Sequence, residues 1–112
     1  MQEIDKLTRQ MQEAIKNSFE YKEYMRLNEL INRNPDVRQR VDELRRENFE
    51  INNCAEDVDI IAASDALNEK YNDLREVENV SQYLASEICL CRMIAEICRN
   101  IVDAVDMDMD FL

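Results

Sequence analysis

The 112-residue sequence contains no glycine and a single proline. Glycine provides the positive-φ positions of tight hairpins and lets the backbone approach a phosphate group closely. Without it, a β-rich fold is hard to build, and the glycine-rich dinucleotide and Walker A loops are excluded. Helices can instead be started and ended by Asn, Ser and Asp. These absences favour an all-α protein.

Histidine and tryptophan are also absent. Histidine is the commonest general base and the commonest metal ligand, so Ser-His and Cys-His catalysis are excluded. What remains for an enzyme is a thiol or a carboxylate acting without these partners. We therefore expect a protein that binds other proteins and is not an enzyme.

The formal net charge is −11, and it is unevenly distributed. Residues 1–56 hold 12 acidic and 10 basic side chains, whereas residues 57–112 hold 13 acidic and only 4 basic ones. Phosphate contacts need clustered Lys and Arg, so direct binding to nucleic acid is not expected. The same acidity disfavours an anionic membrane surface as a partner.

No apolar run approaches the roughly 20 residues that cross a bilayer, and charged residues occur from the start of the chain. We therefore predict neither a membrane span nor a signal peptide, and we expect a cytoplasmic location. In that reducing compartment the cysteines are expected to be free thiols. They are Cys54, Cys89, Cys91 and Cys98.

Apolar residues recur three and four positions apart along most of the chain, which predicts about five helices in a small antiparallel bundle. Ser18 fits the start of the second helix, and the Asn-Pro-Asp run at 34–36 fits the start of the third. We expect one helical domain over residues 1–105 and an acidic, flexible tail at 106–112. The predicted helices are residues 2–16, 19–33, a third from Pro35, a fourth that carries Ile60 to Leu74, and a last one from Asn79 or Ser81 to Val105.

The last predicted helix is long and apolar over most of its circumference. Its charged residues fall in one narrow stripe when side chains are placed at roughly 100° per residue. Such a helix must be covered on several sides, and a chain of this length has few helices to cover it. We therefore expect it to pack centrally and the protein to be oligomeric. The polar stripe consists of Arg92, Glu96, Arg99 and Asp103.

Cys89, Cys91 and Cys98 of this helix are the candidate metal ligands. Cys91 and Cys98 are seven residues apart, so both lie on the apolar face, about 10 Å apart along the axis. Cys89 points roughly 160° away from Cys91, near the polar stripe. Ligands of one metal ion or cluster must converge, so thiols from another segment, such as Cys54, or from another chain would be needed. The alternative is that Cys91 and Cys98 are small core residues.

A group of basic residues follows the proline. Arg38 and Asp42, and likewise Asp42 and Arg46, are four residues apart and can form ion pairs on one helix. The alternative is a patch that recruits an acidic partner. The group consists of Arg38, Arg40, Arg45 and Arg46.

Several short motifs occur in an order and spacing typical of one protein family. They are S-x-E-Y-x-x-Y (Ser18, Glu20, Tyr21, Tyr24), the Asn34-Pro35-Asp36 helix entry, L-R-R-x-N-F (Leu44 to Phe49) and V-x-x-Y-L-x-x-E (Val80, Tyr83, Leu84, Glu87). Over about residues 2–105 the sequence resembles the YlbF/YmcA family of bacterial regulators. None of these motifs is catalytic.

The resemblance implies a non-enzymatic regulatory adaptor that forms oligomers and binds proteins similar to YlbF, YmcA and YaaT. It also implies a role with RNase Y in mRNA processing and in the control of competence, sporulation and biofilm formation. The family is associated with iron–sulfur clusters. A [4Fe-4S] cluster shared between chains, with Cys89, Cys91 and Cys98 as candidate ligands, would make the protein a redox or iron–sulfur sensor, which is the alternative function.

Overall fold

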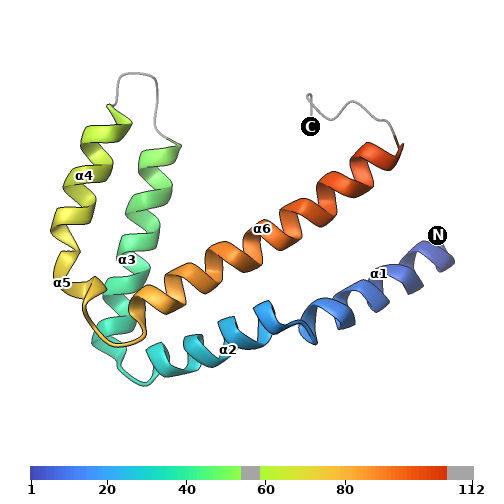
Figure 1. The fold of residues 1–112 in the computed structure, drawn as a ribbon, viewed down its shortest axis with the longest axis horizontal. Coiled ribbons are helices and arrows are strands. Elements are labelled where there is room, and N and C mark those ends of the chain that lie inside the picture. The colour runs from blue at the N-terminus through green and yellow to red at the C-terminus, as the bar shows by residue number, and fades with distance from the viewer. Residues whose placement is uncertain (54–58, 106–112) are drawn as a thin grey trace. The chain divides into compact units, whose positions relative to one another are not determined.

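The computed structural model describes residues 1–53 and 59–105, and within these ranges every regular element is a helix (Figure 1). The all-α prediction is confirmed. None of the helices in this part of the chain has the length and hydropathy of a membrane span. Cys54 and the predicted acidic tail lie outside the described residues. The helices are α1 (Gln2–Lys16), α2 (Phe19–Asn32), α3 (Pro35–Asn52), α4 (Ile60–Lys70), α5 (Asn72–Arg75) and α6 (Val80–Val105).

Short polar side chains start the helices, as expected for a chain without glycine. Ser18 Oγ accepts a hydrogen bond of 3.2 Å from a backbone N–H in the first turn of α2. Asn34 Oδ1 accepts one of 3.3 Å at the start of α3, where Pro35 occupies the first helical position. Asp59 does the same for α4 at 3.1 Å. Each acceptor satisfies an N–H group that the first helical turn leaves without an intrahelical partner.

The prediction of a single fourth helix is wrong, because this segment forms two helices, α4 and α5, which are separated at Tyr71. The backbone of Tyr71 has φ −109° and ψ 18°, outside the helical range. Its side chain is 2% exposed, and the cations of Arg40 and Lys70 lie 5.6 and 5.3 Å from the ring centroid. The described residues therefore form six helices, where about five were predicted. Apolar periodicity continues through this break and gave no sign of it.

Asn79 precedes α6 with a positive φ of 72°. Residues with a Cβ are strained in this left-handed region, and Asn is one of the few that tolerate it. In a chain without glycine, Asn79 therefore occupies a position that glycine commonly takes between helices. Its carbonyl accepts a 2.9 Å hydrogen bond from the N–H of Tyr83. This bond lies at the start of the backbone hydrogen-bond pattern of α6. The predicted start of the last helix is confirmed.

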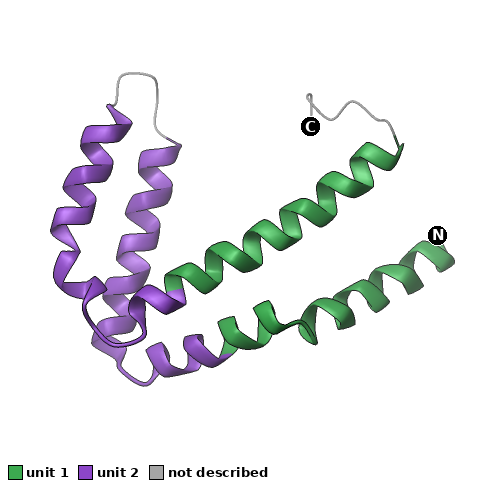
Figure 2. Cartoon of the chain, viewed as in Figure 1, with its two compact units in different colours: residues 1–25, 84–112 green, residues 26–83 purple. Residues whose placement is uncertain are grey.

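The chain divides into two compact units, which Figure 2 shows in different colours. Unit 1 contains residues 1–25 and, within the described part, residues 84–105. Unit 2 contains residues 26–83. The prediction that residues 1–105 act as one domain stays a prediction.

Unit 2 holds the buried apolar core of the described residues. Within it α3 and α4 run side by side, and α5 contacts both (Figure 1). Val41 and Leu44, which belong to the predicted apolar stripe of α3, are at most 3% exposed. Burying one such side chain stabilises the fold by about 1.5–3 kcal/mol. The core consists of Leu27, Ile31, Val41, Leu44, Leu67, Tyr71, Leu74, Val80 and Tyr83.

Unit 1 is packed differently. No side chain of α1 is buried, and among the described residues of this unit only Ser86 is. The buried core includes Val80 and Tyr83 from the first turn of α6, both in unit 2. The expectation that this helix packs centrally is therefore met only at its start. The rest of α6 keeps much of its apolar surface accessible.

Candidate interaction surface

One side of α6 is an open apolar surface, which we name the α6 arc. Its isoleucines and its valine are between 41 and 62% exposed, and its two cysteines are exposed as well. At 100° per residue these side chains fall within about 140° of the helix circumference. An apolar patch of this kind on a folded protein commonly marks a binding surface. The arc consists of Ile88, Cys91, Ile94, Cys98, Ile101 and Val105, and the half-buried Glu87 falls in the same sector at its start.

The two edges of the arc differ in polarity. The predicted polar stripe, from Arg92 to Asp103, runs along one edge, and its four residues are exposed. Beyond the other edge lie Leu90, Met93 and Ile97, which are half-buried. On the helical wheel the arc is therefore bounded by charge on one side and by apolar side chains on the other.

The first helix also presents an apolar stripe. Ile4, Leu7 and Met11 follow one another at spacings of three and four, which places them on one side of α1. They are 58, 55 and 42% exposed. Both α1 and α6 thus carry exposed apolar side chains in the positions where a helix normally packs against a neighbour.

The structure places the three cysteines of α6 on two sides of the helix. Cys91 and Cys98 lie in the α6 arc and are exposed, so the alternative that they are core residues is wrong for the single chain. Within residues 1–53 and 59–105, no element covers these two thiols. Cys89 is also exposed and lines a hollow of about 220 Å³ together with Phe19 and Ser86.

The three thiols do not form a metal site within the described part of one chain. In these residues, no group of three or more Cys, His, Asp or Glu side chains is placed to hold a metal ion. By the spacing argument, one straight helix cannot converge its own thiols. Any cluster on Cys89, Cys91 or Cys98 needs ligands from a second chain or from outside the described residues. Their role as ligands stays a prediction.

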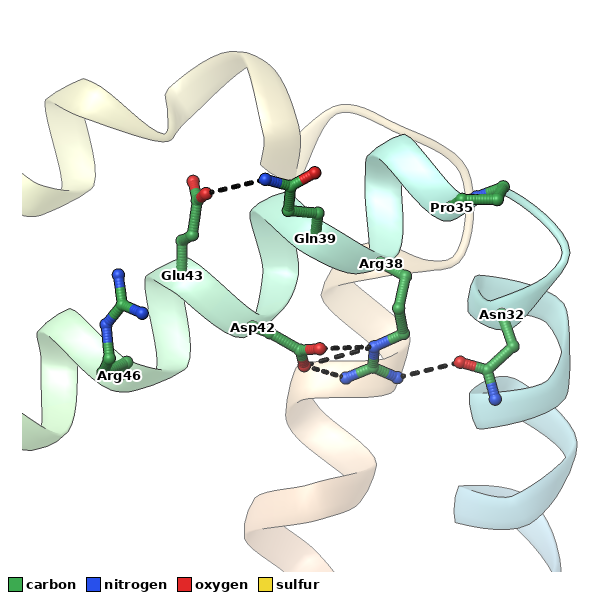
Figure 3. A pocket seen from close by; sticks show the side chains of 7 residues that line it. All are labelled: Asn32, Pro35, Arg38, Gln39, Asp42, Glu43 and Arg46. Carbon is green, nitrogen blue, oxygen red and sulfur yellow. Dashed lines mark hydrogen bonds and ion pairs between the residues drawn. The ribbon is translucent and has the colours of Figure 1, made fainter.

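A polar cluster in unit 2 is organised around Arg38 of α3 (Figure 3). Its Nε donates to both carboxylate oxygens of Asp42, at 3.1 and 3.2 Å. Its terminal nitrogens donate to the amide oxygens of Asn28 and Asn32 at 2.9 and 3.5 Å, and to the hydroxyl of Tyr83 at 3.2 Å. These bonds connect α2, α3 and the first turn of α6 within unit 2.

The ion pair between Arg38 and Asp42 shifts the pKa of both side chains. Hydrogen bonds from Arg38 hold the pKa of the Asp42 carboxyl below its usual value, and Asp42 raises the pKa of Arg38. The Arg38 side chain is only 19% exposed, so the carboxylate compensates a partly desolvated charge. The predicted pair is confirmed. The second partner of Asp42 is Arg45, at 3.3 Å, whereas Arg46 lies 4.0 Å from Glu50.

A hollow of about 780 Å³ lies beside this cluster on α3 (Figure 3). Its side chains pair with one another, since Arg38 binds Asp42 and Gln39 donates to Glu43 at 3.4 Å. Because the N–H donors of Arg38 already form hydrogen bonds within the fold, this side chain is poorly placed to bind a phosphate or carboxylate ligand. We therefore assign the cluster a structural role. The lining consists of Asn32, Pro35, Arg38, Gln39, Asp42, Glu43 and Arg46.

A second set of charged residues connects α3 to α4 and α5. Lys70 Nζ donates to Glu47 at 2.8 Å, and Arg40 donates to both oxygens of Asp73 at 2.8 and 3.1 Å. Tyr71 lies between these pairs, and its hydrogen bond with Glu47, followed by burial, raises the pKa of its phenol. Arg40 is thus an internal ion-pair partner and not a free recruiting charge.

Together, the paired polar clusters and the open apolar stripes define a small all-α protein with no recognisable catalytic arrangement in its described residues. Residues 4–106 match the family described as "Control of competence regulator ComK, YlbF/YmcA". The chain therefore belongs to the YlbF/YmcA family of regulators, as its motifs predicted.

The chain is also similar to a "UPF0342 protein" of Caldicellulosiruptor bescii. The two sequences are 22% identical over 108 residues, which cover 95% of this chain and 91% of the relative. No solved structure matches the chain. A regulatory role accords with the description of the family.

Sequence reasoning missed the contribution of Tyr83, Asn28 and Asn32 to the Arg38 cluster. Tyr83 was recognised only as part of a family motif. Its partner lies 45 residues earlier in the chain, so no local spacing could reveal the contact. A tyrosine at an apolar helix position is the one available signal, because a buried hydroxyl needs a hydrogen-bond partner.

Proposed function

We propose that the protein is a non-catalytic regulatory adaptor that acts in the cytoplasm by binding other proteins. The observation that carries this proposal is the exposure of apolar side chains at helix-packing positions along both α1 and α6. Apolar area of this kind is stabilised by transfer from water, at about 25 cal/mol per Å². A partner that covers these stripes supplies that stabilisation.

The proposed partners are further copies of this chain, proteins similar to YlbF, YmcA and YaaT, and RNase Y. The role is the one that the family resemblance implies, in mRNA processing and in the control of competence, sporulation and biofilm formation. Membership of a regulator family supports this assignment. The mixed charge of α1 and α6 supports a protein partner over a nucleic acid.

The test compares two substitutions in α6 that introduce the same carboxylate. Ile94 is 41% exposed and lies in the α6 arc, whereas Asn100 is exposed outside it. Ile94→Asp should abolish self-association and capture of the purified partners, and Asn100→Asp should leave both unchanged. Far-ultraviolet circular dichroism checks that both variants keep their helices. Equal binding by the two variants would overturn the proposal.

The alternative is a redox or iron–sulfur sensing module. The observation that favours it is that Cys89, Cys91 and Cys98 are all exposed and so accessible to a cluster completed by a second chain. Anaerobic purification should then give a brown protein that absorbs near 400 nm. Cys91→Ser should remove that absorbance. A colourless protein, alone and with its partners, would leave only the adaptor.

A further inference from the structure

The two cysteines of the α6 arc have a special spacing. Because Cys91 and Cys98 are seven residues apart, they lie roughly 20° apart around the helix and about 10 Å apart along its axis. Both are exposed, and both lie near the middle of the arc. A helix that covers the arc therefore meets both thiols.

The charge of this segment permits a second copy of the chain as that helix. The whole chain carries −11, which opposes association of like molecules. Residues 84–105, however, contain three acidic and two basic side chains, so this surface is nearly neutral. Along the polar stripe the charges alternate in sign, from Arg92 and Glu96 to Arg99 and Asp103. Such a stripe can pair with its own copy.

The unequal edges of the arc decide the direction of pairing. A parallel copy would place the charged edge of one helix against the apolar edge of the other, where the charges would lose water without gaining partners. An antiparallel copy, related by a two-fold axis, brings like edges together. Apolar side chains then face apolar ones, and Arg92 comes close to Glu96 of the partner subunit.

We infer that two copies pair antiparallel through the α6 arc, and that peroxide links Cys91 of each copy to Cys98 of the partner subunit. The inference rests on the self-association proposed above. When the two-fold axis passes between residues 94 and 95, Cys91 of one copy lies level with Cys98 of the partner subunit. The symmetry produces this thiol pair twice.

Each link consumes two thiols and one molecule of hydrogen peroxide. One thiolate attacks the peroxide, the O–O bond breaks with loss of hydroxide, and a sulfenic acid forms. The second thiol attacks that sulfur, so the S–S bond forms and the S–O bond breaks. In total the thiols lose two electrons and two protons, and the peroxide is reduced to two molecules of water. A dithiol reductant reverses the step.

Oxidation would convert a reversible contact into a covalent one. A non-covalent dimer dissociates on dilution by mass action, whereas a doubly linked dimer does not. The α6 arc would then stay covered at any protein concentration, and other proteins would be denied this surface. Peroxide would thereby regulate the same surface that the proposed adaptor function uses.

The test starts from a chain in which Cys54→Ser and Cys89→Ser remove the other thiols. From it, two single-thiol chains are made by adding either Cys91→Ser or Cys98→Ser. In the antiparallel pair neither single-thiol chain can link to itself, but a mixture of the two can. Non-reducing electrophoresis after peroxide should show a band at twice 13.3 kDa only for the mixture. At equal amounts at least half of the chains should enter it, since random pairing makes half of the dimers mixed and exchange of the reversible dimers renews the mixed ones.

The outcomes separate the inference from the proposed function. A link within each single-thiol chain alone would overturn the antiparallel arrangement. Absence of any link, with a dimer seen by light scattering, would overturn the inference and leave self-association intact. A monomer at micromolar concentration would overturn the inference and the proposed self-association, whereas binding of the other proposed partners has its own test.

Discussion

The guanidinium of Arg38 donates a hydrogen bond of 3.2 Å to the hydroxyl of Tyr83 and lies 5.1 Å above the centroid of its ring. The two residues are 45 positions apart in the chain. Tyr83 is 1% exposed, so this bond gives its buried hydroxyl a partner inside unit 2. The contact fixes the first turn of α6 to α3.

Tyr83→Phe should lower the free energy of unfolding by about 1 kcal/mol. The ring stays buried, and the acceptor for Arg38 is lost. Urea unfolding followed by circular dichroism measures the change. Gln82→Ala, at the exposed neighbouring position, should shift stability by less than about 0.5 kcal/mol. Equal effects of the two substitutions would contradict a structural role for the hydroxyl.

Leu44→Ala should destabilise the protein by about 2–5 kcal/mol, because it leaves a cavity in the core of unit 2. Leu44 is 3% exposed in the middle of α3. Two positions further on, Arg46 has a side chain that is 67% exposed, so Arg46→Ala should cost about 0.5 kcal/mol or less. The difference between the two denaturation midpoints tests the assignment of the buried face.

The Arg38–Asp42 pair predicts an acid-sensitive part of the stability. The pKa of Asp42 is lowered in the folded state by its hydrogen bonds with Arg38. Its contribution is therefore fully present above the unfolded pKa, near 4, and is lost as the pH falls through the lower folded value. Asp42→Asn should cost about 1 kcal/mol at pH 7, since the Asp42 side chain is 50% exposed, and less at pH 3.

Unfolding of the wild type and the Asp42→Asn variant at pH 7, 5 and 3 measures this convergence. The control is the same comparison in an Arg38→Gln background, where Asp42 has lost the partner that lowers its pKa most. In that background the effect of Asp42→Asn should be smaller and should vary less with pH. A difference in stability that widened on acidification would reverse the sign of the argument.

Asn79 offers a test of backbone strain. Its φ of 72° is costly for most residues with a Cβ, by about 1–2 kcal/mol. Asn79→Ala should therefore destabilise the protein by about 1 kcal/mol, whereas Asn79→Gly should be close to neutral, because glycine adopts this φ readily. Thermal unfolding of the two variants distinguishes this effect from the loss of the side chain, which both share.

The helices could be predicted largely because their causes are local. The caps at Ser18 and Asn34 and the stripe through Val41 and Leu44 depend on residues within a few positions of one another. The break at Tyr71 could not be predicted in the same way. It coincides with ion pairs that join α3 to α4 and α5, whose partners are 23 and 33 positions apart in the chain.

The sequence predicted which residues form the candidate site, but it did not predict how exposed their side chains are. The spacing of Cys91 and Cys98 correctly placed both on the apolar side of α6. Whether that side is covered depends on which other elements reach it, and the periodicity of one helix contains no such information. The apolar pattern of α6 fits a core helix and an interface helix equally well.

If a second copy covers the α6 arc, thermal stability should depend on protein concentration. A ligand at 100 times its dissociation constant adds about 2.7 kcal/mol to the stability of the form that binds it. For a domain of this size, that corresponds to a rise of several degrees in Tm across a roughly hundredfold increase in concentration. Ile94→Asp should remove this dependence, because it places a carboxylate inside the contact, while Asn100→Asp should retain it. Differential scanning calorimetry under reducing conditions measures the effect without any contribution from disulfides. A wild-type Tm that stays constant over that range would show that the arc is not covered by a second copy.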